Sequence, residues 1–230
     1  MSSTKESFLR KIRNNLPHAL IPEASAEHPG LFQDYTYPTD APTDLLIERF
    51  KRELEALSGH VHVLADIEEL VSTIRKILDQ HQARRVLAWE GAALGASWLD
   101  KALAEAGIDL VRHQLPEDAA NRKAHLAELD HIIVGLTGAD GALADTGTLA
   151  LVSGPGKGRL ASLLPPVHIA LVARNKLYPS LPAFLMANPT VTAEGSNLIL
   201  ITGPSRTGDI EMTLTMGVHG PGEIHTIITP

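Results

Sequence analysis

Two kinds of hydrophobic pattern alternate along residues 43–136. In one kind, apolar residues recur every three or four positions, as on the buried face of a helix, and the helices that this pattern predicts are 43–57, 66–78, 94–107 and, more weakly, 117–129. The other kind is a short run rich in Val and Ile, and the strands that it predicts are 61–64, 83–90, 108–113 and 131–136. Helices and strands in alternation predict an α/β fold with a mostly parallel sheet and helices on both sides.

The second half of the chain adds four more apolar runs and most of the glycines. The runs are apolar nearly throughout, as in strands buried on both faces, and they are 148–153, 167–172, 198–202 and 223–228. Thirteen of the 18 glycines follow residue 134. Ligands of such sheets gather at the carboxyl ends of the strands. We therefore expect the specialised loops, and the site, in this half.

The N-terminal 42 residues form a region separate from the alternating pattern. Residues 7–16 carry apolar side chains at helical spacing with basic residues on the other side, and residues 17–42 are a proline-rich connector that contains three aromatic residues. The helix could dock on a partner or on a membrane surface. We expect it instead to pack on its own domain or on a second copy of the chain, which allows a homo-oligomer. The organisation predicted is 1–42 followed by a single α/β domain over 43–230.

Composition narrows the classes of partner. The chain has a net charge of −7 and no basic stripe beyond the extreme N-terminus, so we expect no nucleic-acid partner. No apolar run approaches the length of a membrane span, and we expect a cytoplasmic protein without a signal peptide. The absence of cysteine excludes a thiolate nucleophile and cysteine ligands for zinc or an iron–sulfur cluster. We expect no cofactor on this chain.

The first chemically informative stretch is TGADGALADTGTLALVSGPGKGR, residues 137–159. A Walker phosphate loop is excluded because Leu151 stands at its first glycine position and Gly158 follows Lys157. The dinucleotide-binding fingerprint is excluded because Arg159 replaces its third glycine. The glycine-rich turn still offers backbone amides beside two cations, which suits an anion. A tight strand-to-helix turn with solvated charges is the alternative.

The second stretch, TGPSRTGDIEMTLTMGVHGPGEIH, follows the predicted strand 198–202. Asp209 and Glu211 are either the acidic residues of a helix's first turn or a carboxylate pair beside Arg206 for acid–base chemistry. His219, between glycines, is a candidate proton shuttle. Glu223 shares a strand face with His225, but His219 lies outside that face across a proline turn. We therefore expect no metal site.

The two loops would form one cleft if their strands are neighbours. The residues that we expect to bind a ligand there are Thr137, Asp140, Thr146, Gly147, Thr148, Gly154, Arg159, Gly203, Ser205 and Arg206. The candidate catalytic residues are Asp209, Glu211 and His219. Hydroxyls, backbone amides and an arginine suit a small carboxylate or phosphate, because arginine binds planar oxyanions through two donors.

The two stretches resemble blocks found in the lactate utilization protein C family and its LUD domain. The resemblance is close over residues 131–173 and 198–229, with Asp145 where the family more often has Glu and Gly208 where it more often has Ala. It implies a three-layer α/β/α fold like that of the ribose-5-phosphate isomerase, glucosamine-6-phosphate deaminase and coenzyme A transferase group. It also implies a role in bacterial oxidation of L-lactate to pyruvate, with two iron–sulfur proteins as partners.

Two functions remain open. The chain could be a non-redox accessory subunit of a lactate-oxidising assembly, which the lack of cysteine and of a cofactor loop favours. Alternatively, it could be an independent enzyme acting on a phosphorylated or coenzyme-A-linked molecule, as the fold group suggests. A nucleophilic Glu211 or a basic His219 opening on a pocket would favour the enzyme.

Overall fold

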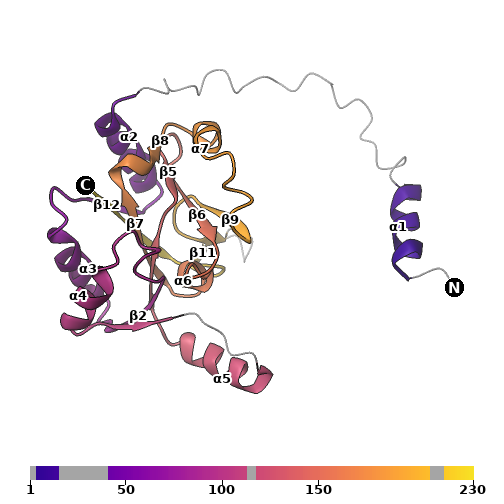
Figure 1. The fold of residues 1–230 in the computed structure, drawn as a ribbon, viewed down its shortest axis with the longest axis horizontal. Helices are drawn as coiled ribbons and strands as arrows, with labels where there is room; N and C mark the ends of the chain where they lie inside the picture. Colours follow the sequence, from indigo (N-terminus) through magenta and orange to yellow (C-terminus); the bar gives the residue numbers. More distant parts are fainter. Residues whose placement is uncertain (1–3, 16–40, 113–117, 208–214) are drawn as a thin grey trace. The chain divides into compact units, whose positions relative to one another are not determined.

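A computed structural model describes residues 4–15, 41–112, 118–207 and 215–230 (Figure 1). The chain divides into two compact units, Met1–Asp34 and Tyr35–Pro230. In the first unit, helix α1 (Thr4–Asn15) leaves Phe8 62% exposed. The expected packing of the N-terminal region stays a prediction, because most of residues 1–42 lie outside the described part of the chain.

A parallel sheet is the centre of the second unit. Within the described residues it has six strands in the order β1-β12-β7-β4-β2-β3, and all its strand pairs are parallel. The strands are β1 (His60–Val63), β2 (Arg85–Ala88), β3 (Asp109–Val111), β4 (Val134–Gly138), β7 (Val167–Ala173) and β12 (Glu223–Thr229). The α/β fold with a mostly parallel sheet is therefore confirmed. Its central strands are buried along nearly their whole length, as their apolar sequences predict.

Helices cover both faces of this sheet. Helices α2 (Thr43–Ala56), α3 (Glu69–Gln80) and α4 (Leu99–Glu105) lie on one side, and the short α6 (Leu160–Leu163) lies on the other (Figure 1). Helix α6 approaches β4 very closely, because a Cβ added to Gly135 would lie 1.8 Å from the carbonyl oxygen of Ala161. Only glycine permits that contact. Helix α5 (Ala119–Leu129) begins where Asp118 accepts a hydrogen bond from the amide of Asn121.

A second sheet, which the hydrophobic pattern does not reveal, packs beside the first. Its order is β8-β5-β6-β9, and β6 runs antiparallel to both of its neighbours. The strands are β5 (Gly141–Leu143), β6 (Thr148–Ser153), β8 (Leu177–Tyr178) and β9 (Asn197–Ile201). Residues 148–153 and 198–202 thus contain the predicted strands, but these lie in this mixed sheet. An apolar run shows that a strand is buried and carries no information about which sheet buries it.

The remaining elements are short connections. A 3₁₀ turn (Arg174–Lys176) precedes β8, and α7 (Leu181–Ala187) follows it, with Ser180 accepting a hydrogen bond from the amide of Ala183. Strands β10 (Arg206–Thr207) and β11 (Thr215–Met216) pair in antiparallel fashion. Residues 206–207 are therefore extended. The alternative that Asp209 and Glu211 belong to a helix's first turn lies outside the described residues. In the described parts of the chain, no helix has the length and apolar character needed to cross a bilayer.

Candidate functional site

A groove opens beyond the end of β9, where the second sheet meets the start of β12. Residues 202–206 leave the strand through a turn in which Gly203 has a φ of 80°, and a Cβ there would meet Leu57 at 2.9 Å. The turn is fixed to the segment before β12, because the amide of Ser205 donates to the carbonyl of Pro221 at 2.8 Å. The carbonyl of Ser205 in turn accepts from the amide of Gly217 at 2.9 Å.

The groove has a volume of about 350 Å³ and brings together four of the predicted site residues. These are Gly203, Ser205, Arg206 and His219. Arg206 and His219 are both exposed. The groove is also lined by Ile224 of β12. A polar turn, a cation and an imidazole thus surround a shallow site with an apolar wall.

Arg206 is held by the end of helix α2. Its Nη2 donates to the carbonyl oxygen of Leu57 and lies 3.2 Å from the hydroxyl of Ser58. Carbonyl groups in the last turn of a helix lack partners within the helix, and a cation at that end also interacts favourably with the helix dipole. Arg206 therefore has a structural contact as well as a place on the groove, which its sequence context did not indicate.

Thr146 and Thr148 lie near the end of β9, as expected for neighbouring strands. The two strands are antiparallel, however, and not parallel as in the sheet that the sequence predicts. Because β6 and β9 are antiparallel, the start of β6 is next to the end of β9. A row of hydroxyls results: Thr146 lies 2.7 Å from Thr148, which lies 2.7 Å from Thr202. Gly147 makes the turn between them with a φ of 63°. These hydroxyls bind one another, and Thr146, Gly147 and Thr148 do not line the groove.

The glycine-rich turn at residues 154–158 follows β6, at the end of that strand opposite to Thr148. Lys157 forms an ion pair with Asp140 at 2.7 Å, and its Nζ also lies 5.5 Å from the ring centre of Trp89. The second carboxylate oxygen of Asp140 accepts from the amide of Val152 at 2.7 Å. The carboxylate of Glu90 lies against Gly156, where a Cβ would approach it to 2.9 Å. With two carboxylates beside this turn, its cations are balanced, and the turn is a poor anion site.

The predicted ligand-binding residues therefore do not form a single cleft. Asp140 and Gly154 line a small separate pocket of about 160 Å³. Arg159 is exposed at the start of α6, and Thr137 is fully buried beneath that helix. The remaining predicted catalytic residues, Asp209 and Glu211, lie outside the described part of the chain.

A cluster of histidines that the sequence pattern alone did not reveal lies on the opposite face of β12. Its members are His60, His62, His81, Glu223 and His225. Nε2 of His225 lies 2.7 Å from Oε1 of Glu223, and Nε2 of His81 lies 3.2 Å from the same oxygen. The sequence does contain one signal of this cluster. Two predicted strands each place two potential ligands on one face, in the HVH of residues 60–62 and the EIH of residues 223–225. Strand pairing, which the sequence does not show, brings them together.

Comparison with known proteins places the chain in a family. The sequence model of the LUD domain matches residues 47–229. The chain belongs to the LUD domain family. It is 31% identical over 223 residues to "Lactate utilization protein C" of Macrococcus caseolyticus, covering 94% of this chain and 92% of that protein. It is 33% identical over 196 residues to "Lactate utilization protein C" of Deinococcus radiodurans, covering 84% of each.

A solved structure supports the architecture of this LUD domain. The crystal structure of a DUF162 family protein from Deinococcus radiodurans matches with a TM-score of 0.60 and 27% sequence identity. The match covers 82% of this chain and 99% of that one. The resemblance to the lactate utilization protein C family is thus confirmed, together with the α/β fold class.

A small cavity lies at the carboxyl edge of the parallel sheet in this LUD domain. It has a volume of about 100 Å³ and is lined mainly by Ala, Gly and Leu residues from α3, from residues 93–96 and from the ends of β4 and β7, and also by Lys176. The predicted site residues that come together lie instead beside the start of β12, at the amino edge. In this LUD domain, the groove therefore depends on the second sheet, since β9 supplies one of its walls.

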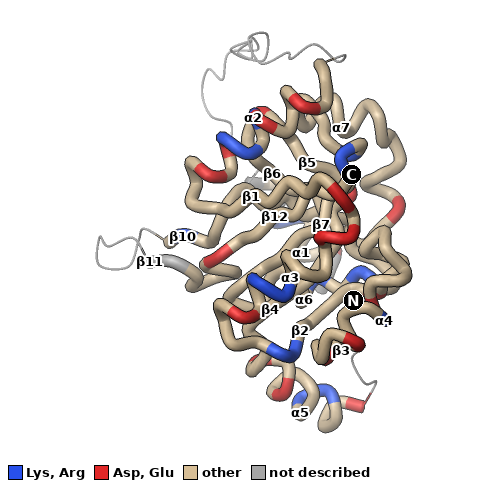
Figure 2. The backbone as a smooth tube through the Cα atoms, turned by 90° about the vertical axis from the view of Figure 1, so that its left-hand side faces the viewer, with Lys and Arg blue, Asp and Glu red and all other residues tan. Residues whose placement is uncertain are grey.

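Charge on the surface of the LUD domain is mixed. In Figure 2, Lys and Arg alternate with Asp and Glu along α2 and around the parallel sheet, and they do not gather into one stripe in that view. Ion pairs within helices, such as Arg49 with Glu53 at 2.9 Å, account for part of this pattern. In that view, the described residues form no continuous basic stripe of the kind that binds a phosphate backbone.

Proposed function

We propose that this chain is a component of a bacterial lactate-utilization system that supports oxidation of L-lactate to pyruvate. The observation that carries the proposal is the similarity to proteins named "Lactate utilization protein C" over more than nine-tenths of both chains. The match to the LUD domain model, residues 47–229, includes both glycine-rich stretches and every strand of the parallel sheet. It is therefore a similarity of the whole domain, and not of one motif.

Within that system we assign the chain a non-redox, accessory role. It has no cysteine, so it offers no thiolate to ligate an iron–sulfur cluster. Electron transfer from lactate requires a redox cofactor, because the side chains of this protein do not carry out that chemistry themselves. We therefore place the redox groups on partner proteins and propose that these are iron–sulfur proteins.

The groove beside Arg206 is the proposed anion-binding site. Its volume of about 350 Å³ suits a small molecule. A guanidinium with donors beyond those used on Leu57 and Ser58, the hydroxyl of Ser205 and the exposed ring of His219 surround it. Lactate and pyruvate share a carboxylate, which arginine recognises through paired hydrogen bonds.

A second function is favoured by one observation, the exposure of His219 on this groove. An imidazole at a binding site can accept and return a proton near neutral pH. The alternative is an enzyme acting on a phosphorylated or coenzyme-A-linked molecule. Such an enzyme would act without partner proteins, whereas an accessory subunit would not.

Complementation combined with co-purification tests the proposal. A strain lacking this protein should fail to grow on lactate and recover with the wild-type gene, and the tagged protein from that strain should carry iron–sulfur partners with it. Normal growth of the deletion strain on lactate would overturn the proposal. Turnover of a phosphate ester or coenzyme A thioester by the purified chain alone, lost in a His219→Gln variant, would establish the alternative.

A further inference from the structure

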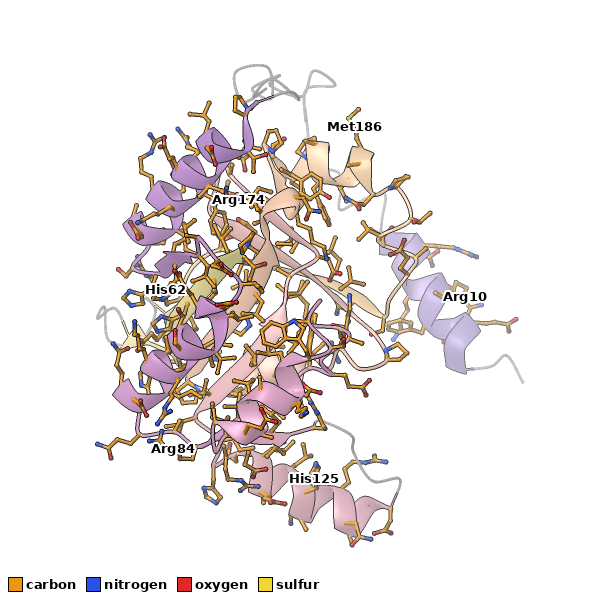
Figure 3. The ribbon with its side chains drawn as sticks, turned by 60° about the vertical axis from the view of Figure 1, so that its left-hand side comes forward. Arg10, His62, Arg84, His125, Arg174 and Met186 are labelled. Atoms are coloured by element: carbon orange, nitrogen blue, oxygen red, sulfur yellow. The ribbon has the colours of Figure 1, made fainter. Side chains whose placement is uncertain are left out.

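Strands β1 and β12 bring three histidines and one glutamate to one edge of the parallel sheet. β1 is the edge strand, and its His60 pairs in register with His225 of β12. Side chains alternate along a strand, so His62 shares the face of His60, and Glu223 that of His225. His81 joins them from the end of α3. Figure 3 shows His62 on β1 between α2 and α3.

Three of these side chains are close enough to hold one ion. One potential ligand atom from each of His60, Glu223 and His225 lies within 4.8 Å of the other two. Ligand atoms about 2.0–2.2 Å from a tetrahedral zinc ion are roughly 3.4 Å apart. Side-chain rotations that move atoms by about 1 Å would therefore bring the set to coordination distance, with the strand backbones unchanged.

The other two histidines are placed to orient these ligands. Nε2 of His62 lies 3.1 Å from Nδ1 of His225, on the side of the ring away from Glu223. Nε2 of His81 lies 3.2 Å from Oε1 of Glu223. A histidine that binds a metal through one nitrogen nearly always donates its other N–H to a neighbouring acceptor, and ligating carboxylates are also hydrogen-bonded. His62 and His81 occupy these two positions.

Hydrogen bonds within the cluster do not explain the position of the His60 side chain. Among the described residues, hydrogen bonds connect the other four members of the cluster. His60 contacts His225 through its ring, and the two stacked rings have their centroids 4.7 Å apart. Its side chain is exposed, whereas His225 is only 4% exposed. A partner shared by His60, Glu223 and His225 would explain why an exposed imidazole lies against a buried one.

We propose that His60, Glu223 and His225 bind a divalent cation of the zinc class, with His62 and His81 as positioning residues. Two imidazole nitrogens and one carboxylate oxygen form a donor set that zinc takes in proteins. Three protein ligands leave a fourth position open, and the exposure of His60 gives water or a small anion access to it. This inference departs from the sequence-based expectation of no metal site.

The cation site is independent of the proposed anion groove. Ile224, between the two ligands on β12, lines the groove. Neighbouring residues of a strand point to opposite faces, so Glu223 and His225 face away from it. Loss of one site therefore leaves the other in place, and failure of the lactate proposal would not affect this one.

Zinc titration of the full chain tests the site. The protein, with any purification tag removed and metals stripped with a chelator, is titrated with Zn²⁺ by calorimetry, and Co²⁺ is added separately to record visible absorption. We expect one Zn²⁺ per chain and the absorption bands of tetrahedral Co²⁺. Absence of stoichiometric Zn²⁺ binding would overturn the proposal.

Variants assign the ligands. His60→Gln and Glu223→Gln should each weaken Zn²⁺ binding more than about 100-fold, and His62→Gln by roughly 10- to 100-fold with a shifted Co²⁺ spectrum. His131→Gln, a change at an exposed histidine outside the cluster, is the matched control and should bind as the wild type does. Circular dichroism checks that each variant folds. Because His60 is exposed, its replacement should not disturb folding, and the His60→Gln variant decides the result if Glu223→Gln does not fold. Unchanged affinity in His60→Gln would rule the site out.

Discussion

The hydroxyl of Thr137 lies 2.8 Å from Nε2 of His168, and both side chains are completely buried between β4, β7 and helix α6. Burial lowers the pKa of His168 from 6.5 to about 4, because a charged imidazole is poorly solvated there. The ring is therefore neutral in the folded protein at neutral pH. In the unfolded chain it becomes protonated as the pH falls below about 6.5.

This difference makes stability depend on pH in a defined window. Between pH 6.5 and about 4 the unfolded state binds a proton that the folded state does not, so stability is fully present above pH 6.5 and falls on acidification. The loss from this residue should total on the order of 3 kcal/mol and level off below pH 4. Urea unfolding at a series of pH values measures it. His168→Gln, which keeps an acceptor for Thr137 but does not titrate, should show a shallower slope, and an equal slope would contradict the prediction.

Replacement of Arg206 should reduce both anion binding and stability. A hydrogen bond to a charged group contributes about 1.5–3 kcal/mol, so Arg206→Ala should weaken lactate or pyruvate binding roughly tenfold to a hundredfold. The same change removes the contact with the carbonyl of Leu57, and we expect the melting temperature to fall by a few degrees. Calorimetry and thermal melting report the two effects separately.

Arg206→Lys and Arg84→Ala are the controls for this experiment. The lysine keeps the charge and should retain part of the affinity. Arg84 is exposed and forms an ion pair with Asp79 at 2.8 Å, away from the groove, and its loss should leave binding unchanged. Wild-type affinity in Arg206→Ala would place the ligand elsewhere.

Two glycines with the same backbone conformation should respond differently to alanine. Gly147 and Gly95 have φ values of 63° and 75°, so each substitution incurs the left-handed strain of about 1 kcal/mol. At Gly147 the new Cβ would also lie 2.5 Å from the backbone nitrogen of Leu54, whereas nothing lies within 4 Å at Gly95. Gly147→Ala should therefore lower the urea midpoint clearly more than Gly95→Ala. Equal midpoints would show that α2 moves away from the new Cβ without a loss of stability.

The ion pair between Asp140 and Lys157 should be coupled energetically. Both side chains are mostly buried, with 20% and 28% exposed, so solvent screens them less than a surface pair. A double-mutant cycle with Asp140→Asn and Lys157→Met should give a coupling energy of about 1 kcal/mol that decreases at high salt. Strictly additive effects on unfolding would show that the pair contributes nothing.

The sequence predicted those parts of the fold that depend on local pattern. Helix α3 and the strands β4, β7 and β12 follow from periodicity, and their alternation implies the parallel sheet. The pattern also places Glu223 and His225 on one face. It does not predict that His60 lies beside them, because that contact depends on the pairing of β1 with β12, which joins positions 60 and 225 across almost the whole domain.

The candidate site was predictable only in part for the same reason. Ser205, Arg206 and His219 lie in one continuous stretch of sequence, and the structure brings them to one groove. The residues taken from the other stretch, Asp140 and Gly154, lie at the far end of β6, because β6 is antiparallel to β9. Strand direction within the second sheet depends on long-range packing, which apolar runs do not encode.

The position of β12 between β1 and β7 also bears on how the protein is made. β1 is among the first elements of the domain to be synthesised, yet within the described residues its pairing partner is β12, the last strand along the chain. Domains generally fold as units during synthesis, so the strands of one sheet must all be available before it is complete. About 160 residues separate the end of β1 from the start of β12, so β1 can gain this partner only after that length of chain has been made. A nascent chain halted before residue 223 would leave β1 and β7 without the strand between them, so synthesis of β12 completes the sheet and adds residues to both the groove and the histidine cluster.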